Sequence, residues 1–287
     1  RSRAAKHSPS KGVAIVIPIY RGVEETRACI KSVLATTGPD VPVILVDDAS
    51  PQGEMLFLLE EQAKHKRVTL HSMKANSGFP AAANSGMALV PDHDIVLLNS
   101  DTMVFPGWLE RLCAHADADP AIATVTPLSN AGSIASYPGG EEATCDEDAA
   151  RARDAWAASA NKGRHVETPT GVGFCMYIRR ACIAELGGFD EQLFGRGYGE
   201  ENDFCMRAAA HGWRHVIAAD TYVWHRNGVS FGTARDGLRY RNSAVLNARH
   251  PDYDALVQAF HKAQPLAPLR REIDVAALRT RTKPVAL

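Results

Sequence analysis

The sequence contains no apolar run of the about 20 residues that a membrane-spanning helix needs, and its N-terminus has no apolar core of the kind found in secretory signals. It also has no excess of charge of one sign, because 32 Lys and Arg residues nearly balance 33 Asp and Glu residues. A protein without a strong overall field attracts neither nucleic acid nor an anionic membrane, so we expect no nucleic-acid partner. A charged ligand must instead be bound by a local site.

Closely spaced pairs of cysteines are also missing. The six cysteines are scattered without a CxxC pair, and most of them lie in apolar segments. This distribution predicts reduced thiols in the core of a cytoplasmic protein and argues against a zinc site. The sequence begins at Arg1 rather than Met, which is compatible with a piece of a longer polypeptide. Peripheral association with the inner face of a membrane would then involve regions outside this sequence.

Apolar segments of strand length alternate with amphipathic helical segments over residues 13–128. Strands are predicted at 13–20, 41–46, 68–73, 94–98 and 122–127, and helices at 24–37, 53–65, 79–90 and 107–119. Continuous apolar strands that alternate with helices are typical of a mostly parallel sheet with helices on both faces. We therefore predict an α/β fold with a Rossmann-like sheet.

The remainder of the chain is organised differently. Residues 1–11 are predicted to be a flexible arm or linker, and residues 129–169 to be mostly loops. A polar helix is predicted near 146–160, a strand at 173–178, helices at 179–187 and 202–212, and a strand-like segment at 214–225. Residues 227–287 are predicted to be a helical C-terminal extension, with helices at 237–250 and 254–264 before a loosely held terminus.

Polar residues follow three of the predicted parallel strands at the points where the strands end. These residues are Tyr20 after the first strand, Asp47 and Asp48 after the second, and Asn99, Ser100 and Asp101 after the fourth. The carboxyl ends of parallel strands meet at one edge of a sheet, where ligands bind. No G-x-G-x-x-G motif follows the first strand, so a dinucleotide site is not expected. A divalent cation held by Asp101 would instead offset the charge of a pyrophosphate.

Each strand-end cluster also has a simpler interpretation when it is taken alone. Asp47 and Asp48 are compatible with an Asx turn or a helix cap. Asn99 and Asp101 are equally compatible with a turn. His225, at the end of the strand-like segment, is either a structural histidine or a second metal ligand beside Asp101.

The acidic residues Glu200, Glu201 and Asp203 follow a glycine-rich loop and accompany the start of a predicted helix. One interpretation is an acidic helix N-terminus that the helix dipole stabilises. The other is a general base on a loop that closes over a substrate.

The ordered set of these segments resembles the inverting glycosyltransferases of family two, which have the GT-A fold. The matching segments are PIY (18–20), VDDAS (46–50), NSGFPAAANSG (76–86), NSDT (99–102), RRACIAELGGFDE (179–191), GEENDFCMRA (199–208) and VWH (223–225). The resemblance covers about residues 12–226 and implies a nucleotide-binding half at 12–128 and an acceptor-binding, catalytic half at 129–226. Bacterial rhamnosyl- and galactofuranosyl-type transferases of surface polysaccharides are similar.

The resemblance implies a role for each matching position. Contacts with a sugar nucleotide are implied for Pro18, Tyr20, Asp47, Asp48, Asn76, Gly78, Phe79, Asn84, Asn99, Ser100 and Asp101. Asn99 and Asp101 fall on the family's Asp-x-Asp metal motif; because its first position is Asn here, binding of Mg²⁺ or Mn²⁺ would depend on Asp101 with His225. Glu201 matches the usual catalytic base, and Glu200 and Asp203 remain alternatives because the family's residue is normally Asp.

These correspondences imply transfer of a sugar from a UDP-, dTDP- or GDP-sugar to a hydroxyl of a glycan or of a lipid-linked glycan, in surface polysaccharide synthesis. The alternatives are a nucleotidyltransferase that makes sugar nucleotides, a glycoside hydrolase with two carboxylates, and a non-catalytic protein that binds sugar nucleotides or carbohydrate.

Overall fold

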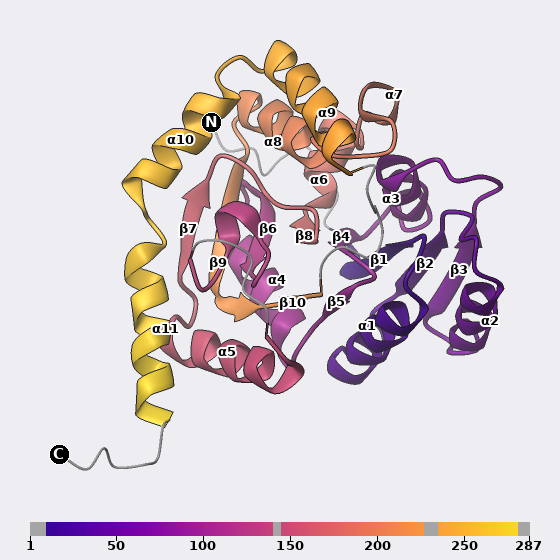
Figure 1. Ribbon diagram of the computed structural model, residues 1–287, viewed down its shortest axis with the longest axis horizontal. Helices are drawn as coiled ribbons and strands as arrows, with labels where there is room; N and C mark the ends of the chain where they lie inside the picture. Colours follow the sequence, from indigo (N-terminus) through magenta and orange to yellow (C-terminus); the bar gives the residue numbers. More distant parts are fainter. Residues whose placement is uncertain (1–9, 140–144, 227–234, 281–287) are drawn as a thin grey trace.

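One eight-stranded sheet runs through the molecule (Figure 1). The computed structural model describes residues 10–139, 145–226 and 235–280, so most of the predicted arm at 1–11 lies outside the described residues. The sheet has the order β3-β2-β1-β4-β8-β6-β9-β7. Its strands are β1 (Val13–Ile19), β2 (Val43–Asp47), β3 (Val68–Ser72), β4 (Asp94–Leu98), β6 (Ile122–Leu128), β7 (His165–Thr168), β8 (Cys175–Ile178) and β9 (Arg214–Tyr222).

Most neighbouring strands are parallel, which confirms the predicted α/β fold. Strands β3, β2, β1 and β4 are parallel, as are β6 and β9. Strand β8 is antiparallel to both β4 and β6, and β7 is an antiparallel edge strand on β9. Because β8 joins β4 to β6, the sheet is continuous across residue 128, where the sequence suggested a boundary between two halves.

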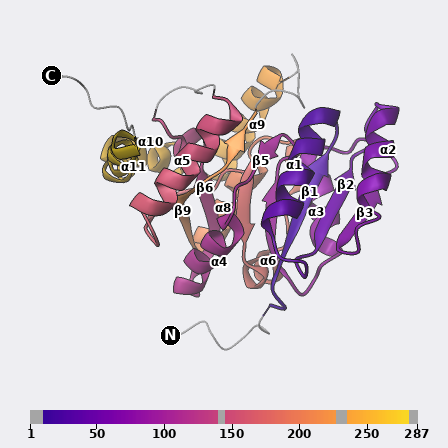
Figure 2. The same cartoon turned by 90° about the horizontal axis from the view of Figure 1, so that it is seen from below.

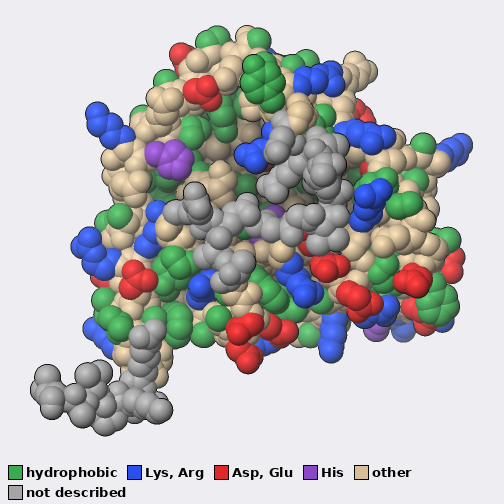
Figure 3. Space-filling model, in the orientation of Figure 1, with side chains coloured by type: hydrophobic (Ala, Val, Ile, Leu, Met, Phe, Trp, Pro, Cys, Tyr) green, Lys and Arg blue, Asp and Glu red, His purple; other side chains and the backbone are tan. Residues whose placement is uncertain are grey.

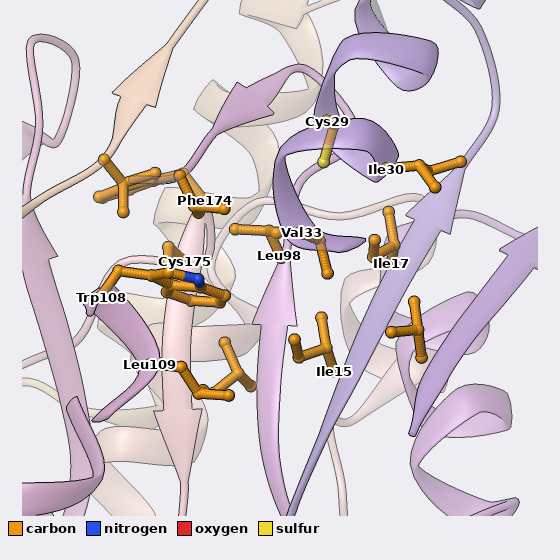
Figure 4. Packing of buried hydrophobic residues seen from close by; sticks show 14 of the residues in the cluster. Ile15, Ile17, Cys29, Ile30, Val33, Leu98, Trp108, Leu109, Phe174 and Cys175 are labelled. Carbon is orange, nitrogen blue, oxygen red and sulfur yellow. The ribbon is translucent and has the colours of Figure 1, made fainter. Parts of the chain in front are cut away.

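Helices cover both faces of this sheet. One face carries α1 (Val23–Thr36), α2 (Gly53–Gln62) and α4 (Trp108–Ala118), and the other carries α3 (Phe79–Ala88), α6 (Arg180–Leu186) and α8 (Glu200–Ala210). Alternate side chains of β1 serve the two faces: Ile15 and Ile17 pack with Trp108, whereas Val16 packs on the α3 side (Figure 4). Four cysteines, Cys29, Cys175, Cys182 and Cys205, are buried, as the sequence predicted.

Several short elements were not predicted from the sequence. These are β7, the two-residue strand β5 (Thr102–Met103), the 3₁₀ helix η1 (Ser133–Ala135) and the four-residue helix α7 (Glu191–Phe194). Their shortness leaves little periodicity to detect. The predicted strand-like segment 214–225 is divided into β9 and the two-residue strand β10 (Trp224–His225), which pairs with β5. The polar helix predicted near 146–160 is present as α5 (Glu147–Ala160), and the Asp146 side chain caps its first turn.

Residues 235–280, the part of the C-terminal region that the structure describes, form three helices. Helices α9 (Arg235–Arg249) and α10 (Tyr253–Ala263) confirm the two predicted there. The expectation of a loosely held chain after residue 264 is wrong, because α11 (Ala267–Thr280) packs along α5 at the end of the sheet far from α2 (Figures 1 and 2). Pro268 lies in the first turn, where proline is tolerated, and Leu269 and Ile273 are buried.

Charged side chains of both signs lie on the face seen in Figure 3, in keeping with the nearly balanced composition. Among the helices that the structure describes, none is long and apolar enough to cross a membrane.

Replacement of Ile273 tests the packing of α11. Ile273 is 0% exposed, so Ile273→Ala should lower the free energy of unfolding by about 2–5 kcal/mol through lost burial and a residual cavity. Leu278 on the same helix is 63% exposed, and Leu278→Ala should change it by no more than about 0.5 kcal/mol. Urea unfolding measures both; equal effects would show that α11 does not pack on α5 in solution.

Candidate active site

A cavity with a volume of about 1120 Å³ lies at the carboxyl ends of β1, β2 and β4 and extends to α8, α9 and α10. It brings together eleven of the residues singled out in the sequence. These are Pro18, Tyr20, Asp48, Asn76, Gly78, Phe79, Asn99, Ser100, Glu200, Glu201 and His225. The strand-end edge and the acidic start of α8 therefore belong to one site.

Asp47 and Asn84 do not line this cavity, and neither does the buried Asp101, whose contact with His225 is described below. The Asp47 carboxylate accepts a hydrogen bond of 2.9 Å from the backbone N–H of Ser50, three residues further along, which is a local side-chain-to-backbone contact within the turn. The Asn84 side-chain amide bonds to the backbone N–H and C=O of Phe189, both at 2.9 Å. The structure gives these two side chains contacts that hold loops in place.

Asp203 is fully buried and also does not line the cavity. Its carboxylate accepts hydrogen bonds from Arg207 at 2.7 Å and from His250 at 2.8 Å, and Arg249 lies 3.2 Å away. These partners tie α8 to the end of α9. Of the three acidic residues considered for the catalytic base, Glu200 and Glu201 line the cavity and Asp203 does not.

Asp48 holds the loop that precedes α3. Its carboxylate accepts hydrogen bonds from the backbone N–H groups of Ser77 at 2.7 Å and Gly78 at 2.8 Å. Burial raises the pKa of Asp48, and these two hydrogen bonds offset part of that effect because they favour the charged form. The loop carrying Asn76 and Gly78 is thereby fixed beside the end of β2.

Gly78 is required by its backbone conformation and by its neighbour. Its φ of 93° lies in the region that favours glycine, and a Cβ atom there would be 2.4 Å from the Arg196 Cα. The Phe79 backbone N–H also donates to the Arg196 carbonyl at 3.4 Å. The glycine-rich loop before α8 therefore packs directly on the loop that Asp48 holds.

Asp101 and His225 meet because β5 pairs with β10, with Thr102 opposite His225. The His225 Nε2 atom lies 3.2 Å from the Asp101 Oδ1 atom. On its other side, the His225 Nδ1 atom is 3.3 Å from the Ala131 carbonyl, and the imidazole ring stacks on Phe174. Donation from Nδ1 to this carbonyl would direct the Nε2 lone pair toward Asp101.

No group of three or more His, Cys, Asp and Glu side chains with the arrangement of a metal site occurs in the described part of the chain. Asp101 and His225 are thus a pair of oxygen and nitrogen donors rather than a complete protein site. The Asn99 side chain, at the first position of the expected motif, lies on the cavity wall nearby but is neutral.

Glu200 and Glu201 form the first turn of α8, whereas the sequence placed the start of this helix at residue 202. Glu200 is only 4% exposed. Glu201 is partly exposed, but its Oε2 atom is buried, and neither this atom nor the Glu200 Oε2 atom has a hydrogen-bond partner among the described residues. Burial raises the pKa of both carboxyl groups.

Sequence reasoning missed part of the cavity wall. Arg196 lines it from the glycine-rich loop, and its setting between Gly195 and Gly197 was an available signal. The wall near α9 and α10 gave no local sequence signal, because its residues become neighbours of the site only through folding. It consists of Leu238, Arg239, Ser243, Leu246, Tyr253 and Val257.

The sequence model of Glycosyl transferase family 2 matches residues 14–187, more than half of the chain. The chain belongs to this family. The match confirms the family and the class of enzyme predicted from the sequence.

Two relatives of this family 2 glycosyltransferase come from Mycobacterium tuberculosis. A pre-mycofactocin glycosyltransferase is 28% identical over 254 residues, which are 85% of this chain and 49% of the relative. The chain thus spans about half the length of that relative. An N-acetylglucosaminyl-diphospho-decaprenol L-rhamnosyltransferase is 27% identical over 262 residues, 83% of this chain and 80% of the relative.

Solved structures share the fold. GalNAc-T7 with UDP, GalNAc and Mn²⁺ aligns with a TM-score of 0.62 and 17% identity over 93% of this chain and 55% of that chain. A mannosyltransferase from Pyrobaculum calidifontis in complex with GDP-Man and Mn²⁺ aligns with a TM-score of 0.61 and 17% identity over 97% of this chain and 78% of that chain. At this identity the likeness concerns the fold alone, and it confirms the predicted GT-A fold.

Gly78→Ala tests the contact between the two loops. It should lower the free energy of unfolding by more than about 1 kcal/mol, because alanine is strained at positive φ and its Cβ would clash with Arg196. Gly53→Ala is the matched control, since nothing lies within 4 Å of its added Cβ; its effect should stay within about 1 kcal/mol. Chemical denaturation compares them, and a harmless Gly78→Ala would contradict this packing.

Proposed function

We propose that this family 2 glycosyltransferase is metal-dependent and inverting, and that it transfers a sugar from a nucleotide diphosphate sugar to a hydroxyl of a glycan or of a lipid-linked glycan. The observation that carries the proposal is the single cavity in which the polar ends of β1, β2 and β4 face the two glutamates of α8. A donor bound at the strand ends would present its sugar to these glutamates. Synthesis of a surface polysaccharide is the setting we propose.

The donor end of the cavity supplies the groups that a nucleotide needs. Tyr20 offers an aromatic ring to a base, and Asp48 and Asn76 offer oxygen and nitrogen atoms to ribose hydroxyls. Arg21 and Arg196 add positive charge along the same wall, which favours a diphosphate. UDP, dTDP and GDP remain alternative nucleotides, because the structural neighbours named with UDP and with GDP-Man share one fold.

Asp101 and His225 fit a divalent cation as neighbouring ligands. The two side chains bring an oxygen and a nitrogen donor within 3.2 Å of each other, close enough for both to hold one cation. With a single carboxylate, most remaining ligands would be water and diphosphate oxygens. When bound, the cation would stabilise the negative charge that develops on the leaving diphosphate. The Mn²⁺ named for both structural neighbours supports this proposal.

Glu201 is our choice for the general base. It would take the proton of the acceptor hydroxyl while the acceptor oxygen bonds to the anomeric carbon from the face opposite the diphosphate. The bond between the anomeric carbon and the phosphate oxygen breaks, and its electron pair leaves with the nucleoside diphosphate. One displacement of this kind inverts the anomeric centre.

The acceptor class is supported by one relative and by the far wall of the cavity. The mycobacterial rhamnosyltransferase is named for a diphospho-decaprenol acceptor. In this chain, Leu246, Tyr253 and Val257 give the wall near Glu201 an apolar character that suits an apolar part of an acceptor.

Family membership favours transfer over the nucleotidyltransferase and glycoside hydrolase alternatives. A non-catalytic protein that binds sugar nucleotides is the second candidate. It is favoured by Asn99, which leaves the expected metal motif with one carboxylate. Binding of a sugar nucleotide without any turnover would select it.

Glu201→Gln separates chemistry from donor binding. Loss of the base should lower nucleotide release from the accepted UDP-, dTDP- or GDP-sugar by about 10²- to 10⁴-fold. Donor affinity should stay near that of the wild type, because the carboxylate acts on the acceptor. A nucleotide-release assay and calorimetry, each with Mg²⁺ or Mn²⁺, measure the two quantities.

Glu54→Gln, at an exposed position of α2, is the control for the general effect of removing a glutamate charge. Unchanged turnover in Glu201→Gln would show that Glu201 is not the general base. Turnover that requires a sugar phosphate and a nucleoside triphosphate would instead identify a nucleotidyltransferase.

Asp101→Ala tests the metal ligands. Removal of the only carboxylate of the pair should abolish the gain in donor affinity that Mn²⁺ produces, while metal-free binding changes little. Asp92→Ala, on an exposed aspartate that pairs with Lys11, is the control and should keep the full response. Calorimetric titration of the donor with and without Mn²⁺ measures this gain in affinity. A full gain in Asp101→Ala would exclude Asp101 as a metal ligand.

A further inference from the structure

We propose that Glu200 is a second catalytic residue, which carries a proton in the resting enzyme and donates it in a hydrogen bond to a substrate hydroxyl beside an ionised Glu201. The proposal rests on the transferase function above and deepens it. It assigns different protonation states and different roles to two adjacent residues of the same type.

The geometry requires the two glutamates to be treated as a pair. They are consecutive residues at the start of α8, both line the cavity, and each has a buried Oε2 atom without a partner among the described residues. A buried polar oxygen without a partner destabilises the protein, so a ligand that supplies the missing hydrogen bond gains affinity. Because both side chains line the cavity, their carboxyl groups are positioned to meet the hydroxyl groups of a substrate.

Two adjacent carboxyl groups that share a largely buried site disfavour each other's charged form, so the pKa of one of them is strongly raised. Three arginines, Arg21, Arg196 and Arg239, line the cavity; Arg196 interacts with Asp48, and the influences on the pKa of Glu200 and Glu201 are burial, backbone hydrogen bonds and, for Glu200, the charge of Glu201. Tyr253 from α10 and Cys205 from α8 interact with Glu201, and burial raises the pKa of each, which keeps both neutral. Tyr198, from the loop before α8, and His225 line the same cavity. One proton is therefore retained by the pair near neutral pH.

The surroundings place that proton on Glu200. Burial and the charge of Glu201 together raise the pKa of Glu200 well above its usual range. Burial raises the pKa of Glu201 as well, but hydrogen bonds from backbone N–H groups, including that of Gly173, favour its charged form. A Cβ added at Gly173 would lie 3.8 Å from the Glu201 Cδ atom, so this stretch of backbone lies directly beside the Glu201 carboxyl group.

This division of roles is consistent with the transfer step. The acceptor O–H bond breaks and its proton goes to Glu201, while the hydrogen bond from neutral Glu200 holds a substrate hydroxyl oxygen and leaves its own proton in place. Glu201 returns its proton to water after the product leaves. A base and a hydrogen-bond donor made from one residue type are thus set apart by their surroundings.

Carbon-13 NMR of the full chain with labelled glutamate side-chain carboxyl groups tests the protonation state without any substrate. We expect one glutamate signal at the protonated position at pH 7. It should disappear in Glu200→Gln and persist in Glu201→Gln, with a lower pKa because the neighbouring charge is gone. Glu54→Gln, the exposed control, should leave it unchanged.

Two NMR outcomes would overturn the proposal. One is a wild-type protein in which every glutamate is ionised at pH 7. The other is a protonated signal that survives in Glu200→Gln, which would place the proton elsewhere. Because no donor is needed, either result leaves the proposed transferase function to be decided by its own assays.

Turnover provides the functional half of the test. Because neutral Glu200 is needed, wild-type nucleotide release should fall as pH rises through the pKa of Glu200. Glutamine also donates a hydrogen bond, so Glu200→Gln should stay within about tenfold of the wild type and lose this alkaline decline, whereas Glu200→Ala should lose about tenfold or more. An unchanged alkaline decline in Glu200→Gln, or full activity of Glu200→Ala, would contradict a catalytic Glu200.

Discussion

The parallel hydrogen bonding of β1 with both β2 and β4 is the constraint on which the site depends. In this register Ile19 lies opposite Asp47, and Val16 lies opposite Leu97, so the polar residues that follow the three strands emerge at the same edge. The antiparallel pairing of β8 with β4 and β6 then extends the same sheet into the second half of the chain. Donor groups and candidate catalytic groups thus share one rigid support, although they lie up to about two hundred residues apart in the sequence.

The sequence predicted the parts of the structure that depend on local patterns. Strands with long apolar runs, such as β1, β2 and β4, can be recognised in the sequence because both of their faces are buried. Asp48, which follows β2, and Asn99, which follows β4, line the cavity as expected. Asp47, Asn84 and Asp203 have the same chemistry but different surroundings: each is taken up by hydrogen bonds or ion pairs outside the cavity. Residue type alone does not distinguish a side chain that meets a ligand from one that braces a loop.

Long-range contacts account for most of what the sequence did not predict. Helices α9 and α10 form a wall of the cavity, and α11 packs on α5, only after segments that are distant in the sequence meet. The proline near the start of α11 gave no sign of this packing in the sequence. The family match ends at residue 187, before α8, β9 and these helices, whereas the cavity includes side chains from α8, α9 and α10. The protonation states of Glu200 and Glu201 are likewise a property of the folded surroundings, since their covalent chemistry is identical.

The fully buried side chain of Asn242 on α9 links the C-terminal helices to the loop that precedes the glutamates. Its amide donates hydrogen bonds to the Phe194 and Gly197 carbonyls at 2.8 and 2.6 Å. Any displacement of α9 is therefore transmitted to the backbone from which α8 begins. The C-terminal helices act as a mechanical brace, so exchange of this region between related enzymes would alter the alignment of the glutamates together with the far wall of the cavity. A substitution in this region that alters which acceptor is bound would therefore also alter the position of the glutamates.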